Sequence, residues 1–324
     1  MGEFELIEKL KKILPSPSKR VFVGIGDDTL IAKPPKNRLL WTVDCLVENV
    51  HFDFAYTSSQ EVGWKALAVN VSDIAAMGGK PLYALISLAI PRRITEKKIL
   101  ELYQGIKECA KWAKVEVVGG NISRSPKDFF IDVTVIGETS KPILRRGAKP
   151  GECVAITGFP GLSACGFYAL KKWGRKATKR FPISTQHHLK PQPRLEFAEK
   201  LASYGVSSLI DISDGLSSEL NHLSQESKVG IEIEEKLLPL DLEVKRLAQD
   251  LKRDSLALRI NGGEEYELLM TFPFSRFSDL SMIALEQGVP LTMIGHTVSS
   301  PKKVQLRTRQ GKLKPMIAKG WTHF

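Results

Sequence analysis

The chain has 324 residues, of which 43% are hydrophobic and 26% are charged, and its formal net charge is +11. This length and composition predict a globular protein with two domains of ordinary size. They exclude an integral membrane protein, because no apolar run approaches the roughly 20 residues that a membrane helix needs. The first 14 residues place charges between their apolar positions, which is not the pattern of a secretion signal. We therefore expect a cytoplasmic protein with no membrane partner.

The basic charge is densest between residues 171 and 180, where six Lys or Arg residues occur. Such a stretch raises the possibility of a nucleic-acid partner. Trp173 is the only aromatic residue within it, so we interpret the stretch as a helix end followed by a solvated loop, with no nucleic acid bound. A basic protein can also simply attract an anionic substrate.

The four cysteines stand at positions 45, 109, 153 and 165. None forms a CxxC pair, and none has a histidine at metal-ligand spacing. We expect four buried free thiols.

The first half of the chain alternates between predicted helices and strands. Apolar residues recur every three or four positions over residues 3–14, which indicates a helix. Two more helices are expected over residues 59–77 and 95–113, each beginning near a Ser or Thr suited to cap it. The predicted strands are Arg20–Gly24, Thr29–Lys33, Leu39–Val43, Leu82–Ile90, Val115–Val118 and Phe129–Gly137. This order predicts an α+β layer, with helices packed on one sheet.

A turn-rich junction near residues 147–152 separates the two halves. We place the domain boundary there, which gives domains of residues 1–150 and 151–324. The elements predicted after the junction are a strand over Cys153–Thr157, a helix over Leu162–Trp173, a basic loop over 174–192, a helix over 194–204, a strand over 207–211 and a helix over 214–226. Strands and helices continue to alternate up to the carboxyl end.

Several aspartates lie in apolar or glycine-flanked surroundings, mostly at the ends of predicted strands; they are Asp27, Asp28, Asp44, Asp73, Asp211 and Asp214. Any one of them could cap a helix or form a turn. A fold that gathers four or more carboxylates needs a positive charge to hold them together. Mg²⁺ supplies such a charge, prefers oxygen ligands and bridges phosphate oxygens to carboxylates. Their spacing does not decide whether these aspartates converge in space.

Two glycine pairs are candidates for binding phosphate. Gly119-Gly120-Asn121 follows the predicted strand Val115–Val118, and Gly262-Gly263-Glu264-Glu265 follows the apolar run Leu256–Ile260. Glycine lets backbone N–H groups approach a ligand closely, although most such pairs are turns. The chain contains neither GxxxxGK[ST] nor GxGxxG, so it has no P-loop and no Rossmann nucleotide site, and the protein-kinase signatures are missing as well.

Six motifs follow one another along nearly the whole chain: Gly-Ile-Gly-Asp-Asp (24–28), Val-Asp with a later His (43–51), Ala-Val-Asn-Val-Ser-Asp-Ile-Ala-Ala-Met-Gly-Gly-Lys-Pro (68–81), Asp-Ile-Ser-Asp-Gly-Leu (211–216), Gly-Gly-Glu-Glu-Tyr-Glu-Leu (262–268) and Gly-Trp-Thr-His-Phe (320–324). Together they resemble the thiamine-monophosphate kinase family, within the superfamily of aminoimidazole ribonucleotide synthetase. The resemblance implies a two-domain α+β / α/β fold with ATP and Mg²⁺ in the cleft between the domains. It also implies a homodimer whose amino-terminal sheets join into a barrel, and ATP-dependent phosphorylation of thiamine monophosphate to thiamine diphosphate.

The resemblance implies a role for each residue that matches a family motif. The implied metal ligands are Asp28, Thr42, the Val43 carbonyl, Asp44, Asp73, Asn121, Asp211 and Asp214. The implied ATP contacts are Tyr103, Gly120, Asn121, Arg145 and Ser213. The implied substrate contacts are His51, Glu264, Glu265 and Trp321. Asp214 would hold a metal during catalysis, and Arg145 would steady phosphate charge.

Some of these residues have plainer alternative roles. Tyr103 could serve helix packing, Arg145 could be a surface residue, His51 could be a buried core histidine and Trp321 could anchor the chain end. One position departs from the family, which usually has Asp where this chain has Asn121. Asparagine keeps one oxygen ligand but loses the charge, so one metal is expected to bind more weakly or to be absent.

Other functions remain open from the sequence. Selenophosphate synthetase would need a reactive Cys or selenocysteine near its amino terminus, whereas the first cysteine here is Cys45. The hydrogenase-maturation enzyme ends in a cysteine, and this chain ends in Phe324. A nucleic-acid-binding or regulatory descendant without catalysis is a further alternative, but the retention of nearly every acidic motif residue argues against it.

Overall fold

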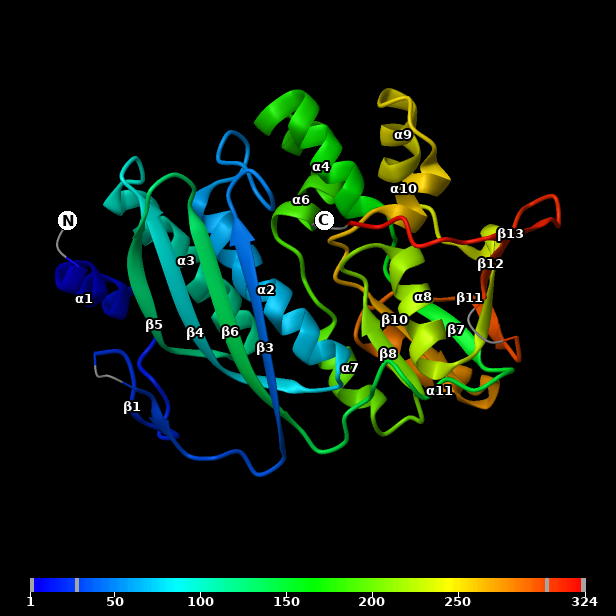
Figure 1. Ribbon diagram of the computed structural model, residues 1–324, viewed down its shortest axis with the longest axis horizontal. Helices are drawn as coiled ribbons and strands as arrows, with labels where there is room; N and C mark the ends of the chain where they lie inside the picture. The colour runs from blue at the N-terminus through cyan, green and yellow to red at the C-terminus, as the bar shows by residue number, and fades with distance from the viewer. Residues whose placement is uncertain (1–2, 27–28, 301–302, 322–324) are drawn as a thin grey trace. The chain divides into compact units, whose positions relative to one another are not determined.

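The computed structural model describes residues 3–26, 29–300 and 303–321. The chain divides into two compact units (Figure 1): unit 1 is Met1–Ile74 with Gly79–Ser140, and unit 2 is Ala75–Gly78 with Lys141–Phe324. The predicted boundary near residue 150 stays a prediction. Asp27, Asp28 and the terminal Thr322-His323-Phe324 lie outside the described residues. None of the helices in the described part of the chain combines the length and the apolar character needed to cross a membrane.

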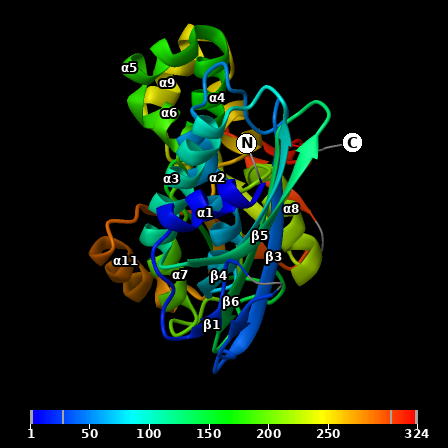
Figure 2. The ribbon, with the colours of Figure 1, turned by 90° about the vertical axis from the view of Figure 1, so that its left-hand side faces the viewer.

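Unit 1 is built on a four-stranded sheet. Its elements are α1 (Glu3–Ile13), β1 (Val21–Val23), β2 (Ile31–Ala32), β3 (Arg38–Val47), α2 (Ser59–Ala76), β4 (Lys80–Pro91), α3 (Glu96–Ala113), β5 (Glu116–Ser125) and β6 (Phe130–Thr139). The strand order is β3-β6-β4-β5, with β4 and β5 parallel and the other pairs antiparallel. Helices α2 and α3 lie on one side of this sheet (Figure 2). The predicted α+β layer is confirmed.

Helices α2 and α3 approach each other closely because each carries a glycine at the contact. A Cβ added to Gly63 would lie 1.9 Å from the carbonyl oxygen of Leu102, and one added to Gly105 would lie 1.8 Å from that of Gln60. Only glycine fits such a backbone contact. The predicted cap of α3 is also confirmed, since Thr95 accepts a hydrogen bond from the Lys98 backbone N–H at 3.4 Å.

Strand β3 presents two different faces. Leu39, Trp41 and Val43 are 49%, 66% and 57% exposed on the face away from the helices. Cys45 follows them and is exposed too, so its predicted burial is wrong. The other three cysteines are buried, and all four are free thiols, as predicted.

Unit 2 is built on a seven-stranded sheet in the order β13-β12-β9-β11-β7-β10-β8. Strands β12 and β9 are parallel, and the other neighbours are antiparallel. Its elements are β7 (Cys153–Thr157), α4 (Leu162–Trp173), η1 (Gly174–Lys176), α5 (Ala177–Arg180), α6 (Pro182–Leu189), α7 (Leu195–Leu201), β8 (Ser208–Asp211), α8 (Leu216–Ser227), β9 (Gly230–Glu234), η2 (Glu235–Leu237), α9 (Leu242–Asp250), α10 (Ser255–Asn261), β10 (Leu268–Phe272), η3 (Phe274–Arg276), α11 (Phe277–Glu286), β11 (Leu291–Val298), β12 (Val304–Arg307) and β13 (Leu313–Pro315).

Helix α8 supplies one side of the main core of unit 2. Its residues Leu216, Leu220 and Leu223 are fully buried against strand residues such as Ile156 and Ile231. Their spacing of four and three positions places them on one face of the helix. The helix begins directly after the Asp211–Gly215 segment, so this packing fixes where that segment lies on the sheet.

The predicted loop over residues 174–192 is wrong, because η1, α5 and α6 fill most of it. Helix α6 starts with Pro182 at its first position, where proline is favoured. The Glu243 carboxylate then accepts hydrogen bonds from the N–H groups of Ile183 at 3.2 Å and Ser184 at 2.8 Å. This cap comes from α9, about 60 residues further along the chain, so local sequence alone could not indicate it.

Candidate active site

Strand β3 and helix α2 bring two predicted metal ligands of unit 1 together. The Thr42 hydroxyl donates a hydrogen bond to Oδ2 of Asp73. Asp44 lies two residues beyond Thr42 on β3, and side chains two residues apart share one face of a strand. All three residues therefore belong to the side of the sheet that the helices cover. Asp28, another ligand predicted in this half, lies outside the described residues.

The glycine pair at 119–120 does not follow the end of a strand, so the predicted end of this strand at Val118 is wrong. Strand β5 continues through both glycines to Ser125. Its register with β4 pairs Gly120 with Ile86 and Asn121 with Ser87. Ile86 lies in the same cross-strand row as Val133 and Asp44.

The neighbouring row contains Asn121, Ser87, Asp132 and Cys45. Successive rows of a sheet point to opposite faces. Within unit 1, the register thus assigns Asn121 to the face opposite Asp44, and Asn121 is exposed there.

His51 and Tyr103 are both engaged within unit 1. Nδ1 of His51 accepts a hydrogen bond from the Val47 backbone N–H at 3.0 Å, so a neutral ring carries its proton on Nε2. Tyr103 is 6% exposed on the packed face of α3. Burial raises the pKa of its hydroxyl. This position fits the plainer alternative for Tyr103, helix packing.

In unit 2 the Asp211–Gly215 segment lies directly against the 262–267 segment. The backbone N–H of Ile212 donates to the Glu267 carbonyl at 2.7 Å, and that of Tyr266 donates to the Ile212 carbonyl at 2.8 Å. The N–H of Glu264 reaches the Ser213 carbonyl at 2.6 Å. These bonds extend the pairing of β8 with β10 into two irregular segments that both carry predicted site residues.

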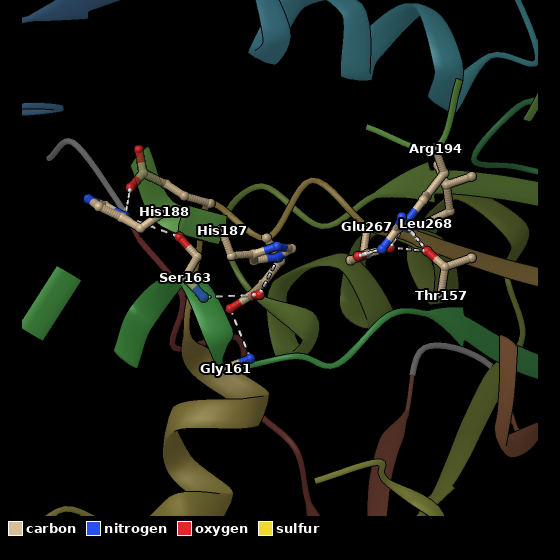
Figure 3. Close-up of polar contacts among 10 residues, drawn as sticks. Thr157, Gly161, Ser163, His187, His188, Arg194, Glu267 and Leu268 are labelled. Atoms are coloured by element: carbon tan, nitrogen blue, oxygen red, sulfur yellow. Dashed lines mark hydrogen bonds and ion pairs between the residues drawn. The ribbon is translucent and has the colours of Figure 1, made fainter. Parts of the chain in front are cut away.

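Two of the three glutamates in the 262–267 segment are fully engaged inside unit 2 (Figure 3). Glu267, with a side chain 2% exposed, receives two hydrogen bonds from Arg194, at 2.7 and 2.5 Å, and one from the Thr157 hydroxyl at 2.5 Å. Glu265 is 1% exposed and accepts hydrogen bonds from the backbone N–H groups of Gly161 at 2.8 Å and Ser163 at 3.3 Å. Both carboxylates therefore hold the fold together.

His187 adds a charged contact to Glu265. Its Nε2 lies 3.2 Å from Oε2 of Glu265, without the alignment of a hydrogen bond, so the contact is an ion pair when the ring is protonated. Burial lowers the pKa of His187, but the Glu265 carboxylate and the charge of Glu267 together outweigh burial, and the net pKa is raised. The raised pKa favours the protonated ring, which balances the charge of buried Glu265.

Glu264 differs from its two neighbours, because its side chain is 29% exposed. Its backbone has φ of +60°, which is uncommon for a residue other than glycine. Oε2 of Glu264 lies 3.3 Å from Nδ1 of His188, and the same nitrogen lies 3.1 Å from the Ser163 hydroxyl. Of the three glutamates, Glu264 is the one that reaches solvent.

Both backbone polar groups of Asp214 are hydrogen-bonded. Its N–H donates to Oε1 of Glu219 at 3.0 Å, and its carbonyl accepts from the Trp321 N–H at 3.0 Å. A Cβ added to Gly320 would lie 2.1 Å from the Asp214 carbonyl oxygen, so the chain end can approach this closely only as glycine. The predicted residues Ser213, Asp214 and Trp321 are thus brought together.

Glu219 was not predicted from the sequence, although its carboxylate accepts a hydrogen bond from the Asp214 backbone N–H. It is 2% exposed on α8. Burial raises its pKa to about 7, while the hydrogen bond from Asp214 and the nearby charge of Arg145 act in the opposite direction. Arg145 itself is exposed, and its carbonyl accepts a hydrogen bond from Ser227 at 3.1 Å.

Comparison with known proteins identifies the family. Residues 26–139 match the model for the AIR synthase related protein, N-terminal domain, and residues 149–304 match that for its C-terminal domain. Thiamine-monophosphate kinase of Aquifex aeolicus is 38% identical over 100% of this chain and 98% of its own length. That of Bacillus subtilis is 37% identical over 100% of both chains. This chain belongs to the thiamine-monophosphate kinase family.

A solved structure agrees with this assignment. AaThiL complexed with AMPPCP and TMP is 37% identical to this chain, covers 100% of it and 97% of its own chain, and superposes with a TM-score of 0.80. The family resemblance and the two-domain fold class expected from the motifs are therefore confirmed.

The donor atoms suit the hard cation that a thiamine-monophosphate kinase is expected to use. Thr42, Asp44 and Asp73 in unit 1 and Asp211 and Asp214 in unit 2 offer oxygen ligands alone. Within the described residues, no group of three or more His, Cys, Asp and Glu side chains is arranged to hold a metal ion. Mg²⁺ usually binds one or two carboxylates together with substrate phosphates and water, so it does not need such a preformed cage. The residues present therefore fit Mg²⁺.

Proposed function

We propose that this protein transfers the γ-phosphoryl group of ATP to a phosphate oxygen of thiamine monophosphate, giving thiamine diphosphate and ADP. The observation that carries the proposal is the match to thiamine-monophosphate kinases over the full length of the chain. The relative AaThiL is complexed with AMPPCP, an analogue of ATP, and with TMP, which supports both substrates.

Mg²⁺ is proposed as the metal of this reaction. The residues that would hold it are Asp28, Thr42, the Val43 carbonyl, Asp44, Asp73, Asn121, Asp211 and Asp214. When bound, Mg²⁺ neutralises phosphate charge, which is the main requirement of phosphoryl transfer between two anionic reactants. The Thr42–Asp73 hydrogen bond supports these two as a pair of oxygen ligands at one place. The register of β5 favours a weaker contribution from Asn121.

Glu264, rather than Glu265, is proposed to contact the substrate. Thiamine monophosphate carries a cationic thiazolium ring, which a carboxylate attracts. Glu265 already accepts two backbone hydrogen bonds and faces His187, and its side chain is fully buried. Glu264 is partly exposed. Trp321, 52% exposed, offers an aromatic face to the same cation, and His51 is retained as a further substrate contact.

The nucleotide contacts are proposed to include Gly120, Arg145 and Ser213. Arg145 is exposed and can reach a phosphate, where a guanidinium binds strongly. Ser213 lies beside Asp214 in the segment that the 262–267 backbone holds. Tyr103 is a weaker candidate because it is buried.

No general base is needed for the proposed reaction. The second proton of a phosphate monoester dissociates near pH 6, so the attacking phosphate is mostly a dianion at pH 7. The protein's own tasks are then to align the two substrates and to balance their charge. Arg145 and the metal ligand Asp214 would serve the charge balance.

A homodimer is proposed as the working form. Leu39, Trp41 and Val43, at alternate positions of β3, expose apolar side chains on one face of the sheet. This exposed face supports pairing of two amino-terminal sheets. The placement of ATP between the domains and a cytoplasmic location stay predictions.

The test is a product analysis with the purified protein, ATP, Mg²⁺ and thiamine monophosphate. Thiamine diphosphate and ADP are expected in equal amounts, and EDTA should abolish both. Absence of thiamine diphosphate at high Mg²⁺ would overturn the proposed reaction. Formation that persists in EDTA would overturn the metal requirement alone.

A further inference from the structure

Helix α6 carries two consecutive histidines that meet two consecutive glutamates of the 262–267 segment. His187 faces Glu265 at 3.2 Å, and His188 faces Glu264 at 3.3 Å. Figure 3 shows the two rings turned towards different partners, with His188 next to Ser163. Each glutamate therefore has its own histidine, although one carboxylate is buried and the other is partly exposed.

The ring of His188 is fixed by its surroundings. Its side chain is 4% exposed, and the Ser163 hydroxyl lies 3.1 Å from its Nδ1. Its ring centre lies 5.6 Å from that of Phe167 on α4. Buried polar atoms of this kind are normally hydrogen-bonded, and a ring packed in this way has little freedom to turn.

Glu264 has a fixed backbone but a side chain that needs support. Its N–H is bound to the Ser213 carbonyl at 2.6 Å, which places its Cα next to the Asp211–Gly215 segment. A partly exposed glutamate side chain still rotates about several bonds, and ordering it on binding a ligand costs affinity. A donor already in contact with the carboxylate removes part of that cost before the substrate arrives.

We propose that His188 is a positioning residue that holds the Glu264 carboxylate ready for the cationic part of thiamine monophosphate. This role rests on the proposed assignment of Glu264 to the substrate. When Nδ1 carries the ring proton, that N–H lies within reach of both Oε2 of Glu264, at 3.3 Å, and the Ser163 hydroxyl, at 3.1 Å. It attracts the carboxylate and leaves the negative charge of Glu264 available to the thiazolium ring. The hydroxyl oxygen of Ser163 can accept part of the same N–H bond, and the contact with Phe167 limits rotation of the ring.

The first variant is His188→Leu, which keeps an apolar side chain in the site but removes the donor. Because a polar contact to a charged group is lost, we expect KM for thiamine monophosphate to rise about tenfold. The KM for ATP and kcat should stay within about twofold, because the variant affects neither the nucleotide nor the phosphates. His188→Asn keeps an N–H near the position of Nδ1 and should restore most of the affinity.

The matched control is His296→Leu, the same change at an exposed histidine on β11. It should leave every kinetic constant unchanged. If His188→Leu lowers thermal stability but leaves KM for thiamine monophosphate at the wild-type value, the residue is structural and the proposal is wrong. Equal losses in His188→Asn and His188→Leu would also overturn it, because the donor would then be irrelevant.

A double-mutant cycle separates this inference from the assignment on which it rests. If Glu264→Gln has no effect on KM for thiamine monophosphate, the assignment of Glu264 itself fails. If Glu264→Gln raises KM but His188→Leu does not, only the role of His188 fails. The expected result is that both single variants raise KM and that the double variant is little worse than Glu264→Gln alone, which is the signature of two residues acting as one unit.

Discussion

Units 1 and 2 present their acidic residues in different ways. In unit 1, Thr42 and Asp73 stand on a regular strand and a regular helix, and one side-chain hydrogen bond joins them. In unit 2, Glu264 to Glu267 stand on irregular backbone with positive φ at Glu264 and Tyr266. That backbone is held by side chains from α6 and from Arg194 just before α7.

This difference separates carboxylates that are available to a ligand from carboxylates that support the backbone around them. A carboxylate on a regular element needs no support for its backbone, so it is available to a ligand. Irregular backbone needs contacts with other segments to hold its conformation, and Glu265 and Glu267 make such contacts. Changes at Glu265 and Glu267 should therefore affect stability first, whereas changes at Asp73 and at the partly exposed Glu264 should affect activity first.

The largest effect is expected from Arg194→Met. It leaves the Glu267 carboxylate, 2% exposed, without its cation. Removing one partner of a buried ion pair costs about 3–5 kcal/mol of the free energy of unfolding. Urea denaturation followed by circular dichroism measures the loss. The double variant Arg194→Met/Glu267→Gln removes the stranded charge and should recover most of the stability. A double variant as unstable as the single one would show that the charge is not the cause.

Asp73→Asn should mainly affect activity. The proposed role as a metal ligand predicts a loss of about 100-fold or more at limiting Mg²⁺, since even changes to the partners of metal ligands cost about 10–100-fold. The free energy of unfolding should change little, because Asp73 lies on a regular helix and is not fully buried. The measurement is the initial rate as a function of Mg²⁺ concentration. Wild-type Mg²⁺ dependence in the variant would remove Asp73 from the metal site.

The buried carboxylate of Glu219 should make stability depend on pH in the absence of metal. Its pKa of about 7 lies above 4.5, the ordinary value for a glutamate, because burial disfavours the charged form. The folded state thus holds this proton more tightly than the unfolded state does. The resulting stability is fully present below about pH 4.5 and is lost as the pH rises towards 7, by at most about 3 kcal/mol.

Glu219→Gln tests this dependence, since glutamine keeps an oxygen acceptor for the Asp214 N–H but does not ionise. Relative to wild type, the variant should gain stability as the pH rises from 4.5 to 8. Thermal unfolding in EDTA at both pH values measures the difference. Parallel pH profiles of the two proteins would mean that Glu219 is ionised in the folded state at neutral pH.

A smaller effect is expected from Gly320→Ala. The new Cβ would lie 2.1 Å from the Asp214 carbonyl oxygen, so the chain end has to move away. Trp321 moves with it, and we expect KM for thiamine monophosphate to rise about fivefold, with about 1 kcal/mol lost in stability from the steric strain. Gly311→Ala is the control: its added Cβ meets nothing within 4 Å, but its φ of +81° strains an alanine, so it should lower stability by about 1 kcal/mol and leave KM unchanged. An unchanged KM in Gly320→Ala would separate Trp321 from the substrate.

The sequence predicted the regular parts of both units well. The helices at residues 59–77 and 95–113 and the elements Cys153–Thr157 and Leu162–Trp173 are found within a residue or two of the predicted bounds. Their patterns are local, so a single sequence carries them. The motifs at 211–216 and 262–268 lie side by side in unit 2, a contact that the sequence did not predict, and the roles assigned to their residues stay predictions.

What the sequence could not show depends on distant contacts. Strand β5 runs through a glycine pair because β4 offers it a partner, and tertiary pairing of this kind overrides the low strand propensity of glycine. Helix α6 depends on a cap from Glu243. His188 and Glu219 escaped prediction for the same reason, since their partners lie in other segments of the chain.

A comparison of the two adjacent glutamates tests most directly whether Glu264 binds the substrate while Glu265 supports the fold. Glu264→Gln and Glu265→Gln make the same chemical change at neighbouring positions, and both KM for thiamine monophosphate and the free energy of unfolding would be measured for each. We expect Glu264→Gln to raise KM for thiamine monophosphate with stability unchanged, and Glu265→Gln to lower stability with KM nearly unchanged. The reverse pattern, with KM raised by Glu265→Gln and stability lost in Glu264→Gln, would contradict this expectation.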